Sequence, residues 1–399
     1  MNDWIPYGRH AIDENDIQAV ISVLKSDWLT CGPAVEQFEN KICEVTQADY
    51  AIACSNGTTA LHLALLALDI KKGDQVIVPA ITFLATANAV RYVDAEVVFA
   101  DVDPETGLMT AETLERAIQN SESRADIKAI INVHFAGQCE NLEEIAAVAK
   151  KYNLRLVDDS AHAIGTNYVN NEGMISPIGS GQYCDLATFS FHPVKTIALG
   201  EGGAITTKNS ILAEKVRMLR SHGMIRNEKN WANKIQAYDE HGNVNPWYYE
   251  MQEIGYNYRV TDISCALGCS QLQKIDNFKD ARQKIVNYYD DHFKNSYFQG
   301  IKKNICSQTA WHLYILRINF KLLNRSRAQV MKYLAEHQIG TQVHYIPVYR
   351  QPYYEERYGK QSLPGAEAYY ETCLSIPLFV NLRNDQQEYI VQKIKSLAK

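Results

Sequence analysis

Short apolar and β-branched runs alternate with longer amphipathic stretches through the first two thirds of the chain. The runs have the length of buried strands, and the stretches between them, such as Asn141–Tyr152, repeat apolar residues at helical spacing. Strands that alternate with crossover helices predict an α/β fold with a mostly parallel sheet. The predicted strands are Gln75–Val78, Glu96–Ala100, Ile127–Val133, Leu154–Val157, Leu186–Phe191 and Ala204–Thr207.

The pattern changes after residue 261 and predicts a smaller α+β domain. We therefore divide the chain into a large domain with an N-terminal arm, residues 1–261, and a small domain, residues 262–399. The segment Ile346–Gly365 is rich in Pro, Tyr and Gly, and we expect an irregular loop there, at the surface or at an active-site mouth. The small domain's predicted elements are helices at Asp262–Lys274, Asp280–Phe293 and Arg327–His337, strands at His312–Phe320 and shortly before the end, and a C-terminal helix.

Composition and charge narrow the functional class. The chain has 399 residues, of which 46% are hydrophobic and 22% charged, and its formal net charge is −6. This composition is typical of a soluble globular protein and offers no basic surface for nucleic acid. The longest apolar run, Ala60–Leu68, is too short to cross a bilayer, and the first ten residues do not resemble a signal peptide. We expect a cytoplasmic protein with no membrane or nucleic-acid partner.

Cysteine and histidine spacing gives no indication of a metal site. The nine cysteines form no CxxC pair, and the eleven histidines show no HExxH motif. We predict reduced thiols and no bound metal.

Lys195 is the first candidate for chemistry, because it follows a predicted strand in the sequence Phe189-Ser190-Phe191-His192-Pro193-Val194-Lys195. A lone lysine is usually solvated. Here its neighbours are apolar or small, so we expect the amine to point into a cleft. Desolvation lowers the pKa of a lysine and frees the lone pair that attacks an aldehyde.

Two acids follow the predicted strand Leu154–Val157. Asp158 and Asp159 are adjacent, so they point to opposite sides of the strand, and His162 comes three residues later. A buried carboxylate facing a pyridine nitrogen would keep that nitrogen protonated and make the ring an electron sink. The alternative is that one or both acids are helix caps or surface acids.

A third candidate segment, Cys54–Ala60, links a short strand to a strongly apolar helix. Hydroxyl groups and backbone N–H groups at a helix N-terminus suit a phosphate, although an ordinary N-cap has the same composition. After the next strand, Phe83 is placed to stack on a cofactor ring or to fill the core.

A phosphate cup, an aromatic residue, an acid and a lysine, each after a separate strand and in this order, resemble the fold-type I pyridoxal-phosphate aminotransferases. The whole chain resembles the DegT/DnrJ/EryC1/StrS sugar aminotransferases, and within them the UDP-4-keto-sugar aminotransferases of the pseudaminic acid pathway. The narrower resemblance is carried by Phe191–Lys195, Arg220–Met224, Gly255–Arg259, Ala266–Gly268, Ser270–Leu272 and Gln342–Tyr349.

This resemblance implies pyridoxal 5′-phosphate as cofactor and assigns a role to each matching residue. Lys195 corresponds to the Schiff-base lysine and proton shuttle, Asp159 to the partner of the pyridine nitrogen, and Phe83 to the residue stacked on the ring. His162 is expected near the ring hydroxyl. The phosphate residues would be Thr58, Thr59 and Ser190, joined by Asn257 from a second subunit of a homodimer with shared sites.

The substrate residues follow from the same resemblance. Arg259 is expected beside the substrate diphosphate, where a guanidinium fork is suited to bind. The sugar-nucleotide pocket would be lined by Tyr7, Trp28, Leu29, Thr30, Gln342, Val343, His344 and Tyr345.

The implied reaction moves nitrogen from L-glutamate to the 4-keto carbon of a UDP-linked 2-acetamido-2,6-dideoxy-β-L-arabino-hexos-4-ulose. The product would be UDP-4-amino-4,6-dideoxy-N-acetyl-β-L-altrosamine, used for pseudaminic acid. Alternatives are another nucleotide sugar, of the bacillosamine, legionaminic or dTDP/GDP type, a pyridoxamine-dependent sugar dehydratase, or a silent binding protein. The intact Lys195 argues against the last two. Segment 225–253 is longer and richer in aromatic residues than in the relatives, so it bears on which sugar is bound.

Overall fold

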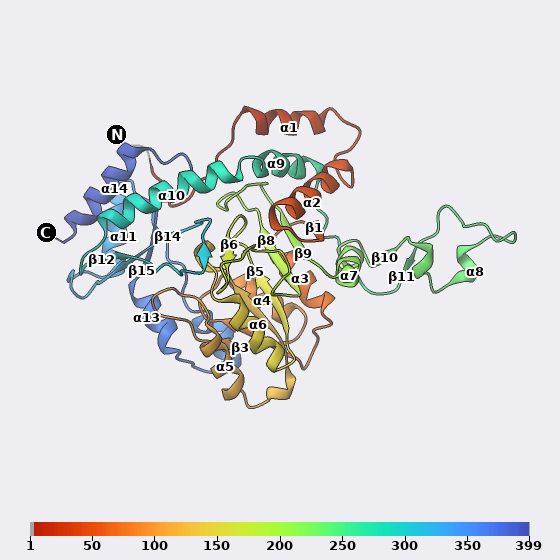
Figure 1. Cartoon of the computed structure of the whole chain (residues 1–399), viewed down its shortest axis with the longest axis horizontal. Coiled ribbons are helices and arrows are strands. Elements are labelled where there is room, and N and C mark those ends of the chain that lie inside the picture. Colours follow the sequence, from red (N-terminus) through yellow and green to blue (C-terminus); the bar gives the residue numbers. More distant parts are fainter. Residues whose placement is uncertain (1–3, 399) are drawn as a thin grey trace.

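A seven-stranded sheet lies at the centre of the computed structural model, which describes residues 4–398 (Figure 1). Its strand order is β1-β9-β8-β5-β4-β2-β3. The pairs β3–β2, β2–β4, β4–β5 and β5–β8 are parallel, whereas β9 is antiparallel to both of its neighbours. The strands are β1 (Tyr50–Cys54), β2 (Gln75–Pro79), β3 (Glu96–Ala100), β4 (Ile127–Val133), β5 (Arg155–Asp159), β8 (Leu186–Ser190) and β9 (Gly203–Thr207). The predicted mostly parallel α/β sheet is confirmed.

The sheet is buried on both faces, and this explains its continuous apolar strands. In β2, Val76 and Val78 face one core cluster and Ile77 faces another, because successive side chains of a strand alternate between faces. Each fully buried Val or Ile stabilises the fold by roughly 1.5–3 kcal/mol relative to exposure. The covering helices are α2 (Pro33–Thr46), α3 (Gly57–Ala67), α4 (Leu84–Tyr92), α5 (Ala111–Asn120), α6 (Leu142–Lys151) and α7 (Ser210–Arg220).

The C-terminal part forms a second layer of helices and strands. Its antiparallel sheet has the order β12-β14-β15 and is joined by α10, α11, α13 and α14. Helix α9 packs on α2 and on the N-terminal helix α1. The bounds are α1 (Glu14–Leu24), α9 (Asp262–Leu272), α10 (Ile275–His292), β12 (Phe298–Gly300), β14 (Tyr314–Ile318), α11 (Arg327–Glu336), α13 (Pro364–Thr372), β15 (Cys373–Ile376) and α14 (Asn384–Ser396). The division at residue 261 stays a prediction.

The segment after α7 extends away from the body as a thin arm (Figure 1). Its base is the antiparallel pair β10 (Met224–Ile225) and β11 (Glu250–Met251), and it carries the short helix α8 (Lys234–Ala237). A further small sheet, β13-β6-β7, comprises β6 (Asn167–Val169), β7 (Ile175–Pro177) and β13 (Ser307–Gln308). The arm corresponds to the long aromatic-rich segment 225–253 noted in the sequence.

The prediction of an irregular loop at Ile346–Gly365 was wrong in part. A short 3-10 turn at Val348–Arg350 leads into helix α12 (Pro352–Tyr358), and α13 already begins at Pro364. Pro352 occupies the first helical turn, where its missing N–H costs nothing, and Gly359 ends the helix with a positive φ of 73°. The prolines and glycine therefore mark the ends of helices.

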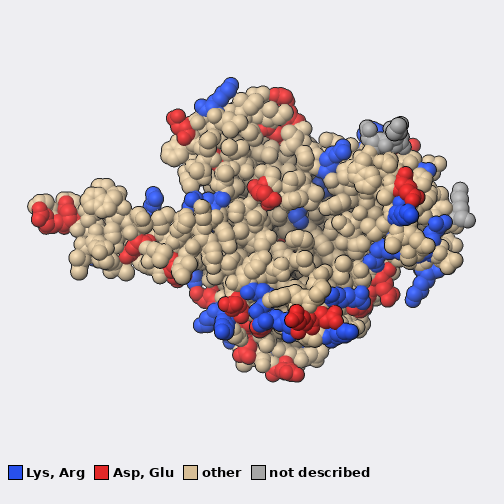
Figure 2. All heavy atoms as spheres, turned by 180° about the vertical axis from the view of Figure 1, so that it is seen from behind, with Lys and Arg blue, Asp and Glu red and all other residues tan. Residues whose placement is uncertain are grey.

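Charged side chains of both signs are interspersed on the face shown in Figure 2. Among the described residues, no helix is long and apolar enough to cross a membrane.

Candidate active site

A cavity of about 630 Å³ opens at the carboxyl edge of the central sheet. The segments that follow β1, β2, β5 and β8 line it, as does the C-terminal segment 342–346. This edge is the usual ligand site of an α/β sheet. The predicted site residues that line the cavity are Tyr7, Thr58, Phe83, Asp159, His162, Ser190, Lys195, Gln342, Val343, His344 and Tyr345.

Lys195 lies between β8 and β9 and directs its amine into this enclosed space. Its backbone N–H donates to the carbonyl of His192 at 2.8 Å, which turns the chain after the strand. Burial lowers the pKa of the ammonium group from 10.5 to about 8, and the nearby charge of Asp159 opposes this shift. The amine is therefore more easily deprotonated than that of an exposed lysine, as a nucleophile requires.

Asp159 is the last residue of β5 and is only 6% exposed. Its carboxylate accepts a hydrogen bond from Thr86 Oγ1 at 2.7 Å and one from the Ala161 N–H at 3.2 Å. Burial raises the pKa of the carboxyl, while the Thr86 hydrogen bond and the charge of Lys195 lower it. Two donors thus fix the orientation of an acid that shares the cavity with the lysine.

The neighbouring acid, Asp158, faces the other side of the strand, as strand alternation predicts. One carboxylate oxygen accepts a hydrogen bond from the Asn132 amide at 3.2 Å, and the other lies 3.2 Å from His134 Nε2. Both acids belong to β5 itself, so the strand continues two residues beyond the predicted end. Only Asp159 lines the cavity.

His162 forms part of an aromatic wall beside the lysine. Its Nδ1 accepts a hydrogen bond from the Ala136 N–H at 3.3 Å, so the neutral ring carries its proton on Nε2 and donates it to Tyr345 Oη, 3.3 Å away. Burial, together with the charge of Lys195, lowers the pKa of His162 well below its usual value. The ring is therefore a neutral donor, and the Tyr345 hydroxyl keeps its own proton for a ligand.

The N-terminus of α3 forms a cradle at one end of the cavity. Asn56 caps the helix by accepting the Thr59 N–H at 2.9 Å, and Gly57 and Thr58 are its first two residues. A Cβ on Gly57 would lie 2.7 Å from the Cβ of Ser190, so glycine is required for this close approach. The hydroxyls of Thr58 and Ser190 and the helix N-terminus make the cradle suitable for a phosphate.

Thr59 does not line the cavity, unlike Thr58, the other predicted phosphate residue of this helix. Its hydroxyl donates to the carbonyl of Asn56 at 2.8 Å and lies 3.2 Å from Ser55 Oγ. The capping box engages the hydroxyl, so its place in the phosphate cup is not supported by the side-chain geometry.

The segment 342–345 closes the cavity from the C-terminal side. His344 is buried, its Nδ1 lies 2.7 Å from Ser375 Oγ, and its ring lies 5.4 Å from that of Tyr7. Burial lowers the pKa of His344 to about 3, so the ring is neutral. The ring centroids of Phe83 and Tyr345 lie 6.1 Å apart, and the Phe83 side chain is 56% exposed. Phe83 is therefore not a core residue.

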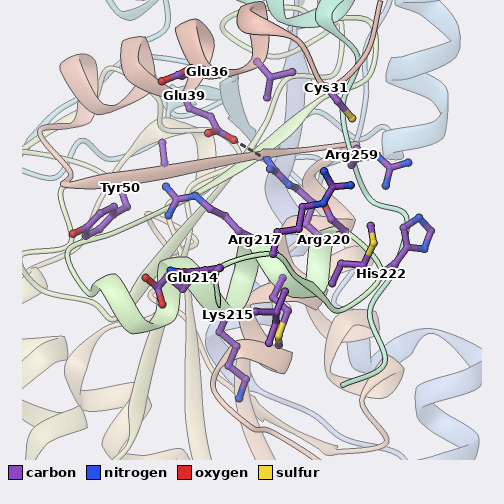
Figure 3. Close-up of a pocket in the computed structure, with 18 of the residues that line it drawn as sticks. Cys31, Glu36, Glu39, Tyr50, Glu214, Lys215, Arg217, Arg220, His222 and Arg259 are labelled. Atoms are coloured by element: carbon purple, nitrogen blue, oxygen red, sulfur yellow. Dashed lines mark hydrogen bonds and ion pairs between the residues drawn. The ribbon is translucent and has the colours of Figure 1, made fainter. Parts of the chain in front are cut away.

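A second, larger cleft of about 1280 Å³ lies between α2, α7 and the base of the arm (Figure 3). Arg220 spans its wall, donating to Glu39 and to the Ala53 carbonyl, both at 2.7 Å. Arg217 lies over the ring of Tyr50. Arg259 lines the same cleft and makes no hydrogen bond or ion pair with any residue the structure describes.

The other predicted site residues also lie away from the Lys195 cavity. Asn257 is exposed beside Ser221, and Trp28, Leu29 and Thr30 are exposed just before Cys31, which lines the larger cleft. One chain therefore brings together the cofactor-type residues but does not join Asn257, Arg259 or 28–30 to them.

Two residues of the cavity were missed in the sequence. Thr86 holds Asp159 from the first turn of α4, and its hydroxyl is hydrogen-bonded at 2.7 Å to that of Thr82, which precedes the helix. His312 is 4% exposed and its ring centroid lies 4.3 Å from that of His162. No local motif marks His312, because it reaches the cavity from the far end of the chain.

The model of the DegT/DnrJ/EryC1/StrS aminotransferase family matches residues 10–395. The chain belongs to this family. It is 35% identical to the spore coat polysaccharide biosynthesis protein SpsC of Bacillus subtilis, over 100% of this chain and 98% of that protein. It is similar in structure to Helicobacter pylori PseC, an aminotransferase involved in pseudaminic acid biosynthesis, with a TM-score of 0.87 and 29% identity over 99% of both chains. It is also similar in structure to the PLP form of a putative sugar aminotransferase, Spr1654 of Streptococcus pneumoniae. That comparison has a TM-score of 0.85 and 28% identity, over 99% of this chain and 98% of that one.

These findings make the protein a pyridoxal-phosphate-dependent sugar aminotransferase of this family. The residues of the cavity fit the cofactor: the glycine cradle at α3 accommodates a phosphate, Asp159 is oriented for a ring nitrogen, and Lys195 supplies a buried amine.

Proposed function

We propose that Lys195 binds the aldehyde of pyridoxal phosphate covalently and serves as the proton carrier of the transamination. The observation that carries this proposal is the juxtaposition of a partly buried lysine of lowered pKa with the buried, doubly hydrogen-bonded Asp159. Such a pairing in a cleft is typical of a catalytic centre. The cradle of Gly57, Thr58 and Ser190 would hold the phosphate.

When bound, pyridoxal phosphate supplies an aldehyde and an electron-withdrawing ring for the transfer of an amino group. The chain's own residues divide the remaining work. Asp159 would pair with the protonated ring nitrogen and Phe83 would cover a ring face. The neutral His162 donates to Tyr345, which leaves the Tyr345 hydroxyl to donate a hydrogen bond at the ring's polar edge. Once the amine of the donor has displaced it from the aldehyde, Nζ of Lys195 would be free to take a proton from the α-carbon of the donor, a step worth roughly 100- to 10,000-fold.

The substrate we propose is the UDP-linked 2-acetamido-2,6-dideoxy-β-L-arabino-hexos-4-ulose, with L-glutamate as the amino donor. The product is UDP-4-amino-4,6-dideoxy-N-acetyl-β-L-altrosamine. Support comes from the likeness to PseC over 99% of both chains. The 345–346 side of the cavity and the Tyr7 phenol would face the sugar.

We propose a homodimer with shared sites, in which Asn257 reaches the phosphate and Arg259 the substrate diphosphate of the second copy. Both residues lie outside the Lys195 cavity of their own chain. Arg259, without a partner among the described residues, has its guanidinium free for an anion.

A second candidate is amination of a different nucleotide 4-keto-sugar. The 35% identity to SpsC, a polysaccharide biosynthesis protein, favours a sugar of another pathway. The fold, the cofactor and Lys195 would keep the same roles.

The visible spectrum of the purified protein with pyridoxal phosphate tests both candidates. We expect a band from the lysine-bound cofactor that bleaches with L-glutamate and returns with the β-L-arabino keto-sugar. Return only with the D-gluco 4-keto epimer, or with a dTDP- or GDP-sugar, would replace the proposed substrate. No bleaching with L-glutamate would refute the amino donor.

A further inference from the structure

The strand-like segment Gly255–Arg259 has two faces. Tyr256 and Tyr258 point inward with their rings stacked, 4.8 Å apart at 16°. Asn257 is exposed between them, and Arg259 lines the larger cleft. Because side chains alternate along an extended chain, the orientation of the two tyrosines determines where Asn257 points.

His62 is the residue on which both tyrosine rings rest. Its ring centroid lies 5.0 Å from that of Tyr256 and 5.9 Å from that of Tyr258, and its Nδ1 lies 3.2 Å from the Tyr258 hydroxyl. His62 is 5% exposed, and its Nε2 is buried without a partner among the described residues. The half-exposed Tyr92 packs on another side of the ring, at 5.6 Å.

His62 belongs to α3, the helix whose N-terminus forms the phosphate cradle. Just before that helix, the backbone N–H of Ser55 donates to the Tyr258 carbonyl at 2.9 Å. Tyr258 is therefore held at three points: its carbonyl by Ser55, its N–H by the Arg220 carbonyl at 3.0 Å, and its side chain by His62. His62 lies five residues beyond Gly57, which corresponds to about 7.5 Å along a helix.

We propose that His62 is a positioning residue that acts through Tyr258 to hold Asn257 where it contacts the cofactor phosphate of a second copy of this chain. This inference rests on the proposed function, namely that Asn257 reaches the second copy. It gives helix α3 two roles. Its N-terminus would hold the phosphate in the site of its own chain, and His62, about one and a half turns further along, would support the Asn257 that enters the site of the second copy.

The test is the affinity for pyridoxal phosphate of His62→Phe, Tyr258→Phe, Asn257→Ala and the double variant His62→Phe with Asn257→Ala. His62→Phe keeps a ring in place and removes both ring nitrogens, of which only Nδ1 meets a described residue, Tyr258. Loss of one hydrogen bond corresponds to about a 2- to 12-fold change in a dissociation constant. We therefore expect His62→Phe and Tyr258→Phe each to raise the dissociation constant for pyridoxal phosphate by about that factor. The double variant should bind no more weakly than Asn257→Ala alone, because residues that act through one contact are not additive.

Pyridoxal, which lacks the phosphate, provides the matched ligand control. Its affinity should be unchanged in His62→Phe and Tyr258→Phe, since Asn257 has no phosphate to contact. The matched protein control is Tyr92→Phe, which removes a hydroxyl from the same cluster that bonds to no described residue. We expect it to bind pyridoxal phosphate like the wild type.

Three results would overturn the inference. Additive losses in the double variant would show that His62 acts independently of Asn257, and equal losses for pyridoxal would show a general structural defect. Full pyridoxal phosphate affinity in Asn257→Ala would refute the proposed contact of Asn257 with the phosphate of the second copy. This failure of the proposed function can be told apart from a failure of the inference about His62, because the variant changes neither His62 nor Tyr258.

Discussion

The cavity at Lys195 has a volume of about 630 Å³, whereas the cleft at Arg259 has about 1280 Å³. In the cavity the acid is only 6% exposed and is held by two donors. In the cleft Arg259 has no partner among the described residues, and the nearby Trp28 is 54% exposed. In the cavity the acid has its partners within its own chain, whereas in the cleft the Arg259 guanidinium has none among the described residues.

This difference corresponds to two kinds of task. Proton transfer and nucleophilic attack depend on desolvation, which lowers the pKa of Lys195 to about 8, so they need an enclosed site. Recognition of a large, doubly charged diphosphate needs an open approach and a free guanidinium. We therefore expect variants in the cavity to lower turnover, and variants in the cleft to weaken substrate binding.

Lys195→Ala should have the largest effect. Because we propose that the amine is both the covalent attachment point and the proton carrier, turnover should fall by about 10,000-fold. The visible band of the bound cofactor should also be lost, which absorbance and steady-state rates would measure. Lys208→Ala, at an exposed lysine after β9, is the matched control. Retained turnover in Lys195→Ala would contradict the assignment.

Asp159→Asn should come next, with turnover lowered by about 100- to 1,000-fold, the usual cost of losing one oriented electrostatic group. The variant also tests the pKa of Lys195. In the cofactor-free protein, capture of pyridoxal phosphate should rise with pH through about 8, as Lys195 loses its proton.

The charge of Asp159 raises the pKa of Lys195, so its removal should lower the pKa. The midpoint of capture in Asp159→Asn should therefore move below that of the wild type. A midpoint that moves upward in Asp159→Asn would contradict the effect of the Asp159 charge. A midpoint near the 10.5 of an ordinary lysine in both proteins would show that burial does not govern this amine.

The sequence predicted the cavity better than the cleft, and the reason is local. Lys195, Asp159, Thr58 and Ser190 each follow or end a strand, and parallel strands bring such residues to one edge whatever the connections do. His312 comes from a distant segment with no spacing signal, so only the packing of the C-terminal part on the sheet places it beside His162.

The ends of strands and helices, and the hydrogen-bond partners of side chains, also could not be predicted from the local sequence pattern. β5 includes the two acids because Asp158 has buried partners in Asn132 and His134 that a polar run of sequence does not reveal. Thr59 has the right position for a phosphate contact, yet the capping box of α3 engages its hydroxyl. The loop predicted at Ile346–Gly365 contains helices because proline and glycine also mark helix ends.

Arg259→Ala should have the smallest effect of the three variants and a different kinetic signature. Losing one charge-assisted contact to the substrate diphosphate should raise KM for the nucleotide sugar by roughly 10- to 100-fold and leave kcat within about a factor of two. KM for L-glutamate should not change, because the amino donor carries no diphosphate. Initial rates with each substrate varied in turn would measure this separation.

Arg217→Ala is the matched control, because it removes the same charge from the same cleft. Its guanidinium lies over the ring of Tyr50, so we expect no change in KM beyond about twofold. If both arginine variants raised KM equally, the cleft would act as a diffuse positive field, which high salt would screen. If Arg259→Ala lowered kcat and left KM unchanged, Arg259 would belong with the chemistry of the cavity, and the contrast between the two regions would not hold.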